Sequence, residues 1–243
     1  MAAGRACPTR LFSCGMCGYE EQPRLKAPDL ERLAQQHREQ LVAAGVELHP
    51  VVSRSRKLAT RFWGSAWMRH LAVCESGGLC LAPGRTLLRH GCVLDVRVSP
   101  GRVTAVVSAD ALYDVELRLT PPDEERVEAL AALCAGKIDS LLSLLEGRVD
   151  EALLQQLCDP ENGLLPEAGD WRISCSCPDW SEPCPHAAAA MYALGVLLDA
   201  QPELLFTLRS IDPSALLRKP EHAPEHFDAA FLSATFGIEL DID

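Results

Sequence analysis

A cluster of three cysteines and one histidine constrains this chain more than any other feature. Within residues 171–191, WRISCSCPDWSEPCPHAAAAM, Cys175 and Cys177 form a Cys-x-Cys pair, and Cys184 and His186 form a Cys-x-His pair after a gap of six residues. Three thiolates and one imidazole make a closed tetrahedral set, which suits a structural zinc ion. Zn²⁺ is therefore the expected cofactor. A catalytic zinc is not expected, because it keeps one position open for water.

The residues around the cluster predict where each pair lies. Arg172 and Ile173 favour a short strand or hairpin that carries the first two cysteines, and the prolines and serine that follow forbid regular structure through the middle. AAAAMYALGVLLDA, directly after His186, is a strong helix former. Two side chains in an x-spaced pair diverge on a regular strand or helix, so each pair should lie at a turn or at an element end. The alternative is that the cysteines are buried small hydrophobes; a Cys-x-Cys disulfide would be strained.

The residues CSCPDWSEPCPH and the alanine-rich helix after them resemble the SWIM zinc finger, whose pattern is Cys-x-Cys, a variable gap and Cys-x-His. Similar stretches cover roughly residues 46–243 and include KLATRFWGSAW, LAPGRTLLRHGCVLDVRVSPGRVTAVVSA, CAGKIDSLLSLLEG, QPELLFTLRSID and FGIELDID. The chain thus resembles bacterial SWIM zinc finger proteins. This resemblance implies zinc binding, with DNA or protein binding as the usual inference, and a Swi/Snf-type ATPase as the suspected partner. It implies no enzymatic activity.

Composition limits the class of protein. The chain has 243 residues, 48% of them hydrophobic, and can bury a real core as one domain or two small ones. It shows no apolar run of membrane-spanning length and no apolar leader, so we expect a cytoplasmic protein without a membrane partner. Eleven cysteines in a reducing compartment indicate thiols and metal ligands rather than a disulfide framework.

The charge is unevenly distributed along the chain. A formal net charge of -11 argues against a general coat for nucleic acid. Residues 1–70, however, hold 11 Lys and Arg against 6 Asp and Glu, which leaves +5 there and -16 in the remainder. The N-terminal part could therefore face phosphate or an acidic partner, although solvated charge alone also explains the count.

A basic run precedes two tryptophans at helical spacing. Basic residues interleaved with aromatic ones can bind nucleic acid by charge and stacking. Trp63 and Trp67, at i and i+4, are expected in the core instead, and the role of the basic run stays open. The candidate phosphate or partner contacts are Arg54, Arg56, Lys57, Arg61, Arg85 and Arg89.

Residues 85–119 form the predicted β region, with four short runs at 85–90, 92–98, 102–108 and 112–119. Alternation places Cys92, Leu94, Val96 and Val98 on one face and Val93, Asp95 and Arg97 on the other. Short connections imply an antiparallel meander with one buried face. The arginines of this region could meet phosphate, but pairing with Asp95, Asp114 and Glu116 across strands is the preferred reading.

The fold class follows as α+β: a four-stranded antiparallel meander flanked by helices, with a C-terminal zinc-stapled helical unit. A helix is expected to start at an Asp29 N-cap and end at Gly45, and further helices follow Pro121-Pro122 and His186. The predicted segments are an irregular, cysteine-bearing 1–28, an α+β domain 29–158, the finger and following helices 159–218, and a linker with an apolar-acidic tail 219–243.

Two weaker features remain. Cys7, Cys14 and Cys17 could form a second metal site, although no fourth ligand is evident nearby. No P-loop or Gly-x-Ser-x-Gly motif is present, and the spacing of Cys74 or Cys92 with His70 or His90 does not indicate catalysis. We therefore expect a non-enzymatic zinc-binding adaptor, with no small-molecule substrate, in a complex acting on DNA. The alternative is a direct DNA-binding protein that uses the N-terminal basic residues and the sheet arginines.

Overall fold

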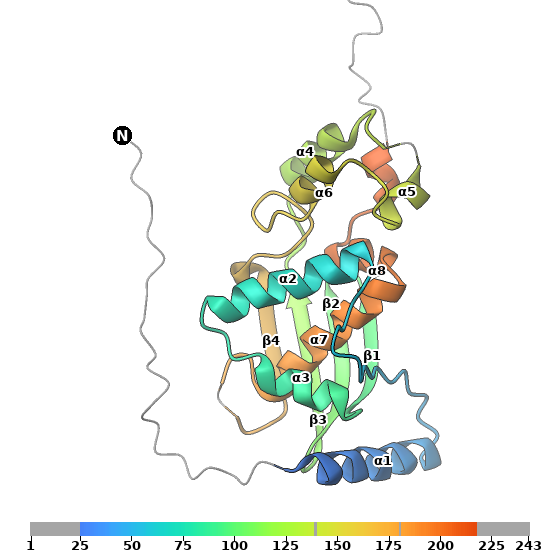
Figure 1. Ribbon diagram of the computed structural model, residues 1–243, viewed down its shortest axis with the longest axis vertical. Coiled ribbons are helices and arrows are strands. Elements are labelled where there is room, and N and C mark those ends of the chain that lie inside the picture. Colours follow the sequence, from blue (N-terminus) through green and yellow to red (C-terminus); the bar gives the residue numbers. More distant parts are fainter. Residues whose placement is uncertain (1–24, 139, 180, 218–243) are drawn as a thin grey trace, which may run out of the picture.

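The structure is a computed structural model that describes residues 25–138, 140–179 and 181–217 (Figure 1). It combines a four-stranded antiparallel sheet with helices, so the predicted α+β class is confirmed. The elements are α1 (Ala27–Ala43), α2 (Phe62–Ser76), α3 (Ala82–Arg89), β1 (Val93–Ser99), β2 (Arg102–Ser108), β3 (Leu112–Leu119), α4 (Glu124–Cys134), α5 (Leu141–Leu145), α6 (Glu151–Leu157), the 3-10 helix η1 (Ala168–Asp170), β4 (Trp171–Cys175), α7 (Pro185–Ala200), α8 (Glu203–Arg209) and the 3-10 helix η2 (Pro213–Leu217).

The sheet follows chain order, β1-β2-β3-β4, but its fourth strand is not the one expected from the sequence. The prediction of a strand over residues 85–90 is wrong, because these residues belong to α3 or follow it directly. Pro83 in the first turn is compatible with a helix, and Leu87 and Leu88 face the core from it. The fourth strand is β4, which carries Cys175 and pairs with β3 in the register Leu117↔Ile173.

β1 departs from simple alternation at its start. Val93 pairs with Val107 and Asp95 with Val106, so the register shifts between them. Val93 and Leu94 are consequently both fully buried, and the prediction that Val93 shares a face with Arg97 is wrong. Such an irregularity re-aims side chains without ending the strand.

Helix α7 forms the centre of the molecule. It contacts all four strands as well as α2 and α3, and Figure 1 shows it crossing the sheet beneath these two helices. A helix that is apolar all round is a buried helix, and the run Ala187–Leu194 is buried throughout. The small alanines let α3 approach closely: a Cβ on Gly84 would clash with the backbone of Ala188.

The two tryptophans of α2 are core residues, as expected. Trp63 is 2% exposed and Trp67 is fully buried. Their indole N–H groups donate to the carbonyls of Leu144 and Met191, each at 3.0 Å. Both rings are therefore unavailable for stacking on bases.

The remaining helices lie at the two ends of the sheet (Figure 1). Helices α4, α5 and α6 gather with η2 at one end, and α1 lies across the other, where it contacts β1 and β2. The predicted N-cap of α1 is wrong: Lys26 takes that position, and Asp29 lies within the first turn. Gly45 follows the helix with φ +79°, as the sequence suggests.

Some predictions are not decided by this architecture. The predicted domain boundary after residue 158 stays a prediction. β4 and α7 follow this boundary in the chain, but they pack against strands and helices that precede it. The 219–243 tail lies outside the described residues. Within the part of the chain that the structure describes, no helix is both long and apolar enough to span a membrane.

Candidate metal centre

The four predicted ligands come from three consecutive pieces of chain. Cys175 is the last residue of β4, Cys177 follows it in a bend, and Cys184 and His186 lie at the start of α7. Each x-spaced pair thus lies at an element end, where its two side chains can converge, as the spacing required.

Local hydrogen bonds hold these pieces in place. Ser176 lies between the first two cysteines. Its hydroxyl accepts a hydrogen bond from the backbone N–H of Asp114 at 2.9 Å, and its own backbone N–H donates to the Asp114 carbonyl at 3.0 Å. At the start of α7, the sulfur of Cys184 accepts the N–H of Ala187 at 3.4 Å and so acts as the N-cap. One pair is therefore fixed to β3 and the other to the helix.

The four ligand atoms converge on one point. The sulfurs of Cys175, Cys177 and Cys184 and a ring nitrogen of His186 all lie within 4.8 Å of one another. His186 Nδ1 is 3.9 Å from the sulfur of Cys175 and 4.0 Å from that of Cys184. Zinc–sulfur and zinc–nitrogen bonds of about 2.3 and 2.05 Å in a tetrahedron give sulfur–nitrogen edges of about 3.6 Å. The distances from Nδ1 to the sulfurs of Cys175 and Cys184 exceed this edge by only a few tenths of an ångström.

Burial governs the protonation of the cluster. It raises the pKa of the Cys175 and Cys184 thiols and lowers that of the His186 imidazole. The imidazole is thus neutral and ready to act as a ligand, while the sulfurs need a cation to become thiolates. A bound Zn²⁺ supplies that charge and deprotonates its thiol ligands. The Cys₃His cluster is consistent with the zinc site of a finger.

A tyrosine of the sheet completes the surroundings of the cluster. The ring of Tyr113, on β3, lies 4.2 Å from that of His186 between centroids, with an interplanar angle of 31°. Its hydroxyl donates to Asp110 Oδ1 at 3.0 Å, and burial followed by this carboxylate raises the pKa of Tyr113 to about 12. Sequence reasoning missed this contact, since no local spacing connects Tyr113 to residue 186.

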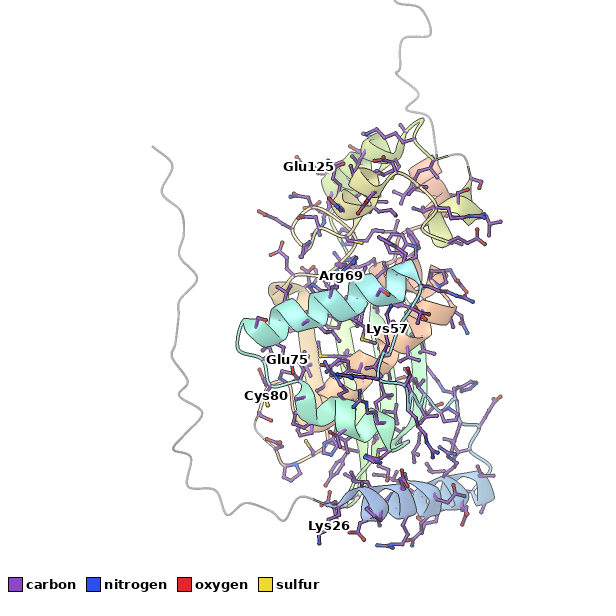
Figure 2. The ribbon with its side chains drawn as sticks, in the orientation of Figure 1. Lys26, Lys57, Arg69, Glu75, Cys80 and Glu125 are labelled. Atoms are coloured by element: carbon purple, nitrogen blue, oxygen red, sulfur yellow. The ribbon has the colours of Figure 1, made fainter. Side chains whose placement is uncertain are left out.

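The candidate phosphate or partner contacts separate into two groups. Arg54, Arg56, Lys57 and Arg61 are exposed on the segment that leads into α2, and Figure 2 shows Lys57 between α2 and α3. Arg89 of α3 joins this group, because its Nη2 donates to the Arg56 carbonyl at 3.4 Å.

Arg85 is engaged with the protein itself. Its Nη2 donates to the Tyr192 hydroxyl at 2.8 Å, its guanidinium carbon lies 4.9 Å from the centre of that ring, and Glu75 lies at 3.8 Å. Arg102 pairs with Glu116 across strands, as the preferred reading expected, whereas Arg97 pairs with Asp95 of its own strand at 2.9 Å.

Two other candidate sites were considered from the sequence: the N-terminal cysteines and the pairs of one cysteine with one histidine. Cys7, Cys14 and Cys17 lie outside the described residues, so a second metal site stays a prediction. Among the cysteine and histidine pairs, Cys74 Sγ is 3.9 Å from His70 Nε2, but burial raises the pKa of that thiol and lowers that of the imidazole. A thiol with a raised pKa is a poor nucleophile.

Comparison with known proteins agrees with this geometry. Residues 165–195 match the model of the SWIM zinc finger, a range that contains β4, all four cluster residues and most of α7. The chain is also 30% identical over 171 residues to the uncharacterized protein Rv2102 of Mycobacterium tuberculosis. That alignment covers 66% of this chain and 58% of the relative. No solved structure matches. Residues 165–195 of this chain therefore form a zinc-binding SWIM finger, and its strand β4 is an edge strand of the sheet.

Proposed function

We propose that this chain is a non-enzymatic, zinc-binding adaptor that works in a complex acting on DNA, with a Swi/Snf-type ATPase as its protein partner. The observation that carries the proposal is the closed Cys₃His set. Four protein ligands fill a tetrahedral zinc, which leaves no position for a catalytic water. The ion then serves as a cross-link between β4 and α7, and the sheet and helices around it are the scaffold that it holds.

The suspected partner follows from the resemblance of this chain to bacterial SWIM proteins and is tested by co-purification. The untagged chain is to be expressed at natural level in its host and isolated under mild salt, with its partners identified by mass spectrometry and its zinc counted on the same sample. We expect a Swi/Snf-type ATPase at a fixed ratio to the chain. The Cys184→Ser variant should lose both zinc and partner, because the surface depends on the cross-link.

Two results of that experiment would oppose the adaptor. Recovery of zinc-loaded chain without an ATPase would remove the proposed partner. Retention of the ATPase by a Cys184→Ser chain that holds no zinc would separate the partner surface from the finger. Cys80→Ser is the matched control, since Cys80 is exposed and lies outside the cluster.

Direct DNA binding is the second candidate, and one observation favours it. The basic residues of the segment before α2 are exposed, and that segment is anchored: the backbone N–H groups of Thr60 and Arg61 donate to Asp199 Oδ1 on α7, at 2.8 and 2.6 Å. Arg89 is fixed beside it. An anchored basic segment can contact phosphates with a smaller loss of conformational entropy than a free one.

Reversing the charge at Arg54, Arg56 and Lys57 tests this candidate. Each phosphate contact that a basic residue makes contributes about -0.9 to the slope of log affinity against log salt for duplex DNA. If the segment binds DNA, the triple change to glutamate should abolish duplex binding at low salt, and the wild-type slope should be about -3 or steeper. Exposed Arg32 of α1, the helix that lies across one end of the sheet, offers a control away from this segment. Equal binding by the wild type and the triple variant would contradict this function.

A further inference from the structure

We propose that Tyr113, held by Asp110, is a positioning residue of the zinc finger: its ring fixes the imidazole of His186 so that Nδ1, and not Nε2, binds the ion. This inference rests on the zinc site proposed above. It adds to the finger two residues from outside the matched segment, and it makes the turn between β2 and β3 a part of the metal centre.

The ring of Tyr113 packs against the imidazole of His186 and limits its rotation. Tyr113 and His186 are both buried, each 9% exposed, and their rings are in contact, with centroids 4.2 Å apart and planes tilted by 31°. An imidazole can turn about the bond that joins it to Cβ, and that torsion is broad and roughly two-fold. A ring packed against one face of the imidazole removes most of this freedom. The plane of His186 is thereby set before the ion arrives.

The hydroxyl of Tyr113 holds its ring in place through a hydrogen bond to Asp110. It donates to Asp110 Oδ1 at 3.0 Å, so the phenol is held at its far end as well as by packing. Asp110 lies in the turn between β2 and β3, which the hydrogen bond from Ala109 N–H to the Ala111 carbonyl closes at 2.8 Å. The order of contacts therefore runs from the turn through Asp110 and Tyr113 to His186. Residues that orient a metal ligand in this way typically contribute about 10- to 100-fold to metal affinity.

The orientation of the imidazole determines which of its nitrogens can bind the ion. Nδ1 is the ring nitrogen that faces the sulfurs, at 3.9 Å from Cys175 and 4.0 Å from Cys184. Nε2 lies across the ring from it and points away from that side. His186 also follows Cys184, the N-cap of α7, by only two residues, so its side chain must turn back to meet the other ligands. The nearer nitrogen, Nδ1, is the one that such a short return brings to the ion.

Zinc release from the full chain distinguishes positioning from ordinary core packing. Zinc-loaded wild type and variants are to be mixed with an excess of a coloured chelator, and the release rate recorded beside the thermal midpoint. Tyr113→Leu should release zinc about 10- to 100-fold faster than the wild type. Tyr113→Phe, which keeps the stacked ring but not the hydroxyl, should release zinc faster than the wild type but more slowly than Tyr113→Leu. Asp110→Ala should resemble Tyr113→Phe.

Leu117→Ala is the matched control. Leu117 lies on the same strand and the same face as Tyr113 and is fully buried, but it is outside the cluster. Its variant should lower the thermal midpoint and leave zinc release near the wild-type rate. If Leu117→Ala speeds release as much as Tyr113→Leu does, or if Tyr113→Leu releases zinc at the wild-type rate, Tyr113 is only a packing residue. Should Tyr113→Leu fail to fold, Asp110→Ala decides, since an unchanged release rate would remove Asp110 from the metal centre.

The choice of nitrogen has its own readout. In the cadmium-loaded chain labelled with ¹⁵N at histidine, coupling between the metal and Nδ1 of His186 is expected. Coupling to Nε2 would overturn this part of the inference. A wild-type chain that binds neither zinc nor cadmium would instead refute the proposed metal site itself, which keeps the two failures apart.

Discussion

Replacing Cys184 by serine is expected to unfold the finger and to destabilise the whole sheet. Cys184 belongs to the closed ligand set and also caps α7, the helix that contacts all four strands. Structural zinc contributes about 10–16 kcal/mol of apparent binding free energy in finger peptides near neutral pH. Loss of one thiolate should therefore cost at least several kcal/mol of the free energy of unfolding. Thermal unfolding followed by circular dichroism measures it.

The same loss should follow removal of the ion by a strong chelator, since both changes delete the cross-link between β4 and α7. Cys80→Ser, at an exposed cysteine outside the cluster, should unfold at the wild-type temperature with or without the chelator. A Cys184→Ser chain with wild-type helicity and an unchanged midpoint would mean that the cluster does not stabilise the fold.

Gly84→Val is expected to produce the second large effect. Helices α3 and α7 approach so closely that even a Cβ at position 84 would overlap the backbone of Ala188 and Ala189. Backbone atoms in the middle of a buried helix cannot move aside as a flexible side chain can. We expect a loss of about 3 kcal/mol or more in the free energy of unfolding, at the upper end of overpacking effects. Urea denaturation measures this loss.

Gly169→Ala is the control for that substitution, because a Cβ on Gly169 would meet no atom within 4 Å. It should leave the free energy of unfolding within about 0.5 kcal/mol of the wild type. If Gly84→Val were tolerated equally well, the close approach of α3 to α7 would be wrong, and so would the layer of helices over the sheet.

Local features of the chain were predictable from the sequence. The ligand pairs, the helix after His186 and the core positions of Trp63 and Trp67 depend on spacings of a few residues. Each of these is present in the structure. The strands β1, β2 and β3 were predictable for the same reason, because short turns connect them.

Contacts between distant segments were not predictable in the same way. β4 was expected as a short strand, but nothing local indicates that it pairs with β3, more than 50 residues earlier in the chain. The stacking of Tyr113 on His186 follows from that pairing and was missed with it. Residues 85–90 were assigned to a strand because Leu87 and Leu88 are compatible with either structure. These residues form a helix in the structure, where Gly84 packs against the backbone of α7. A single sequence does not show this contact between distant segments.

X-ray absorption at the zinc edge of the purified, folded chain tests the central claim most directly. We expect one tightly bound zinc with three sulfurs at about 2.3 Å and one nitrogen at about 2.0–2.1 Å. The same spectrum is expected from a full-length variant in which Cys7, Cys14 and Cys17 are serine, which removes any contribution from the N-terminal cysteines. A folded chain without metal, or a first shell that lacks three sulfurs and one nitrogen in that variant, would contradict the account.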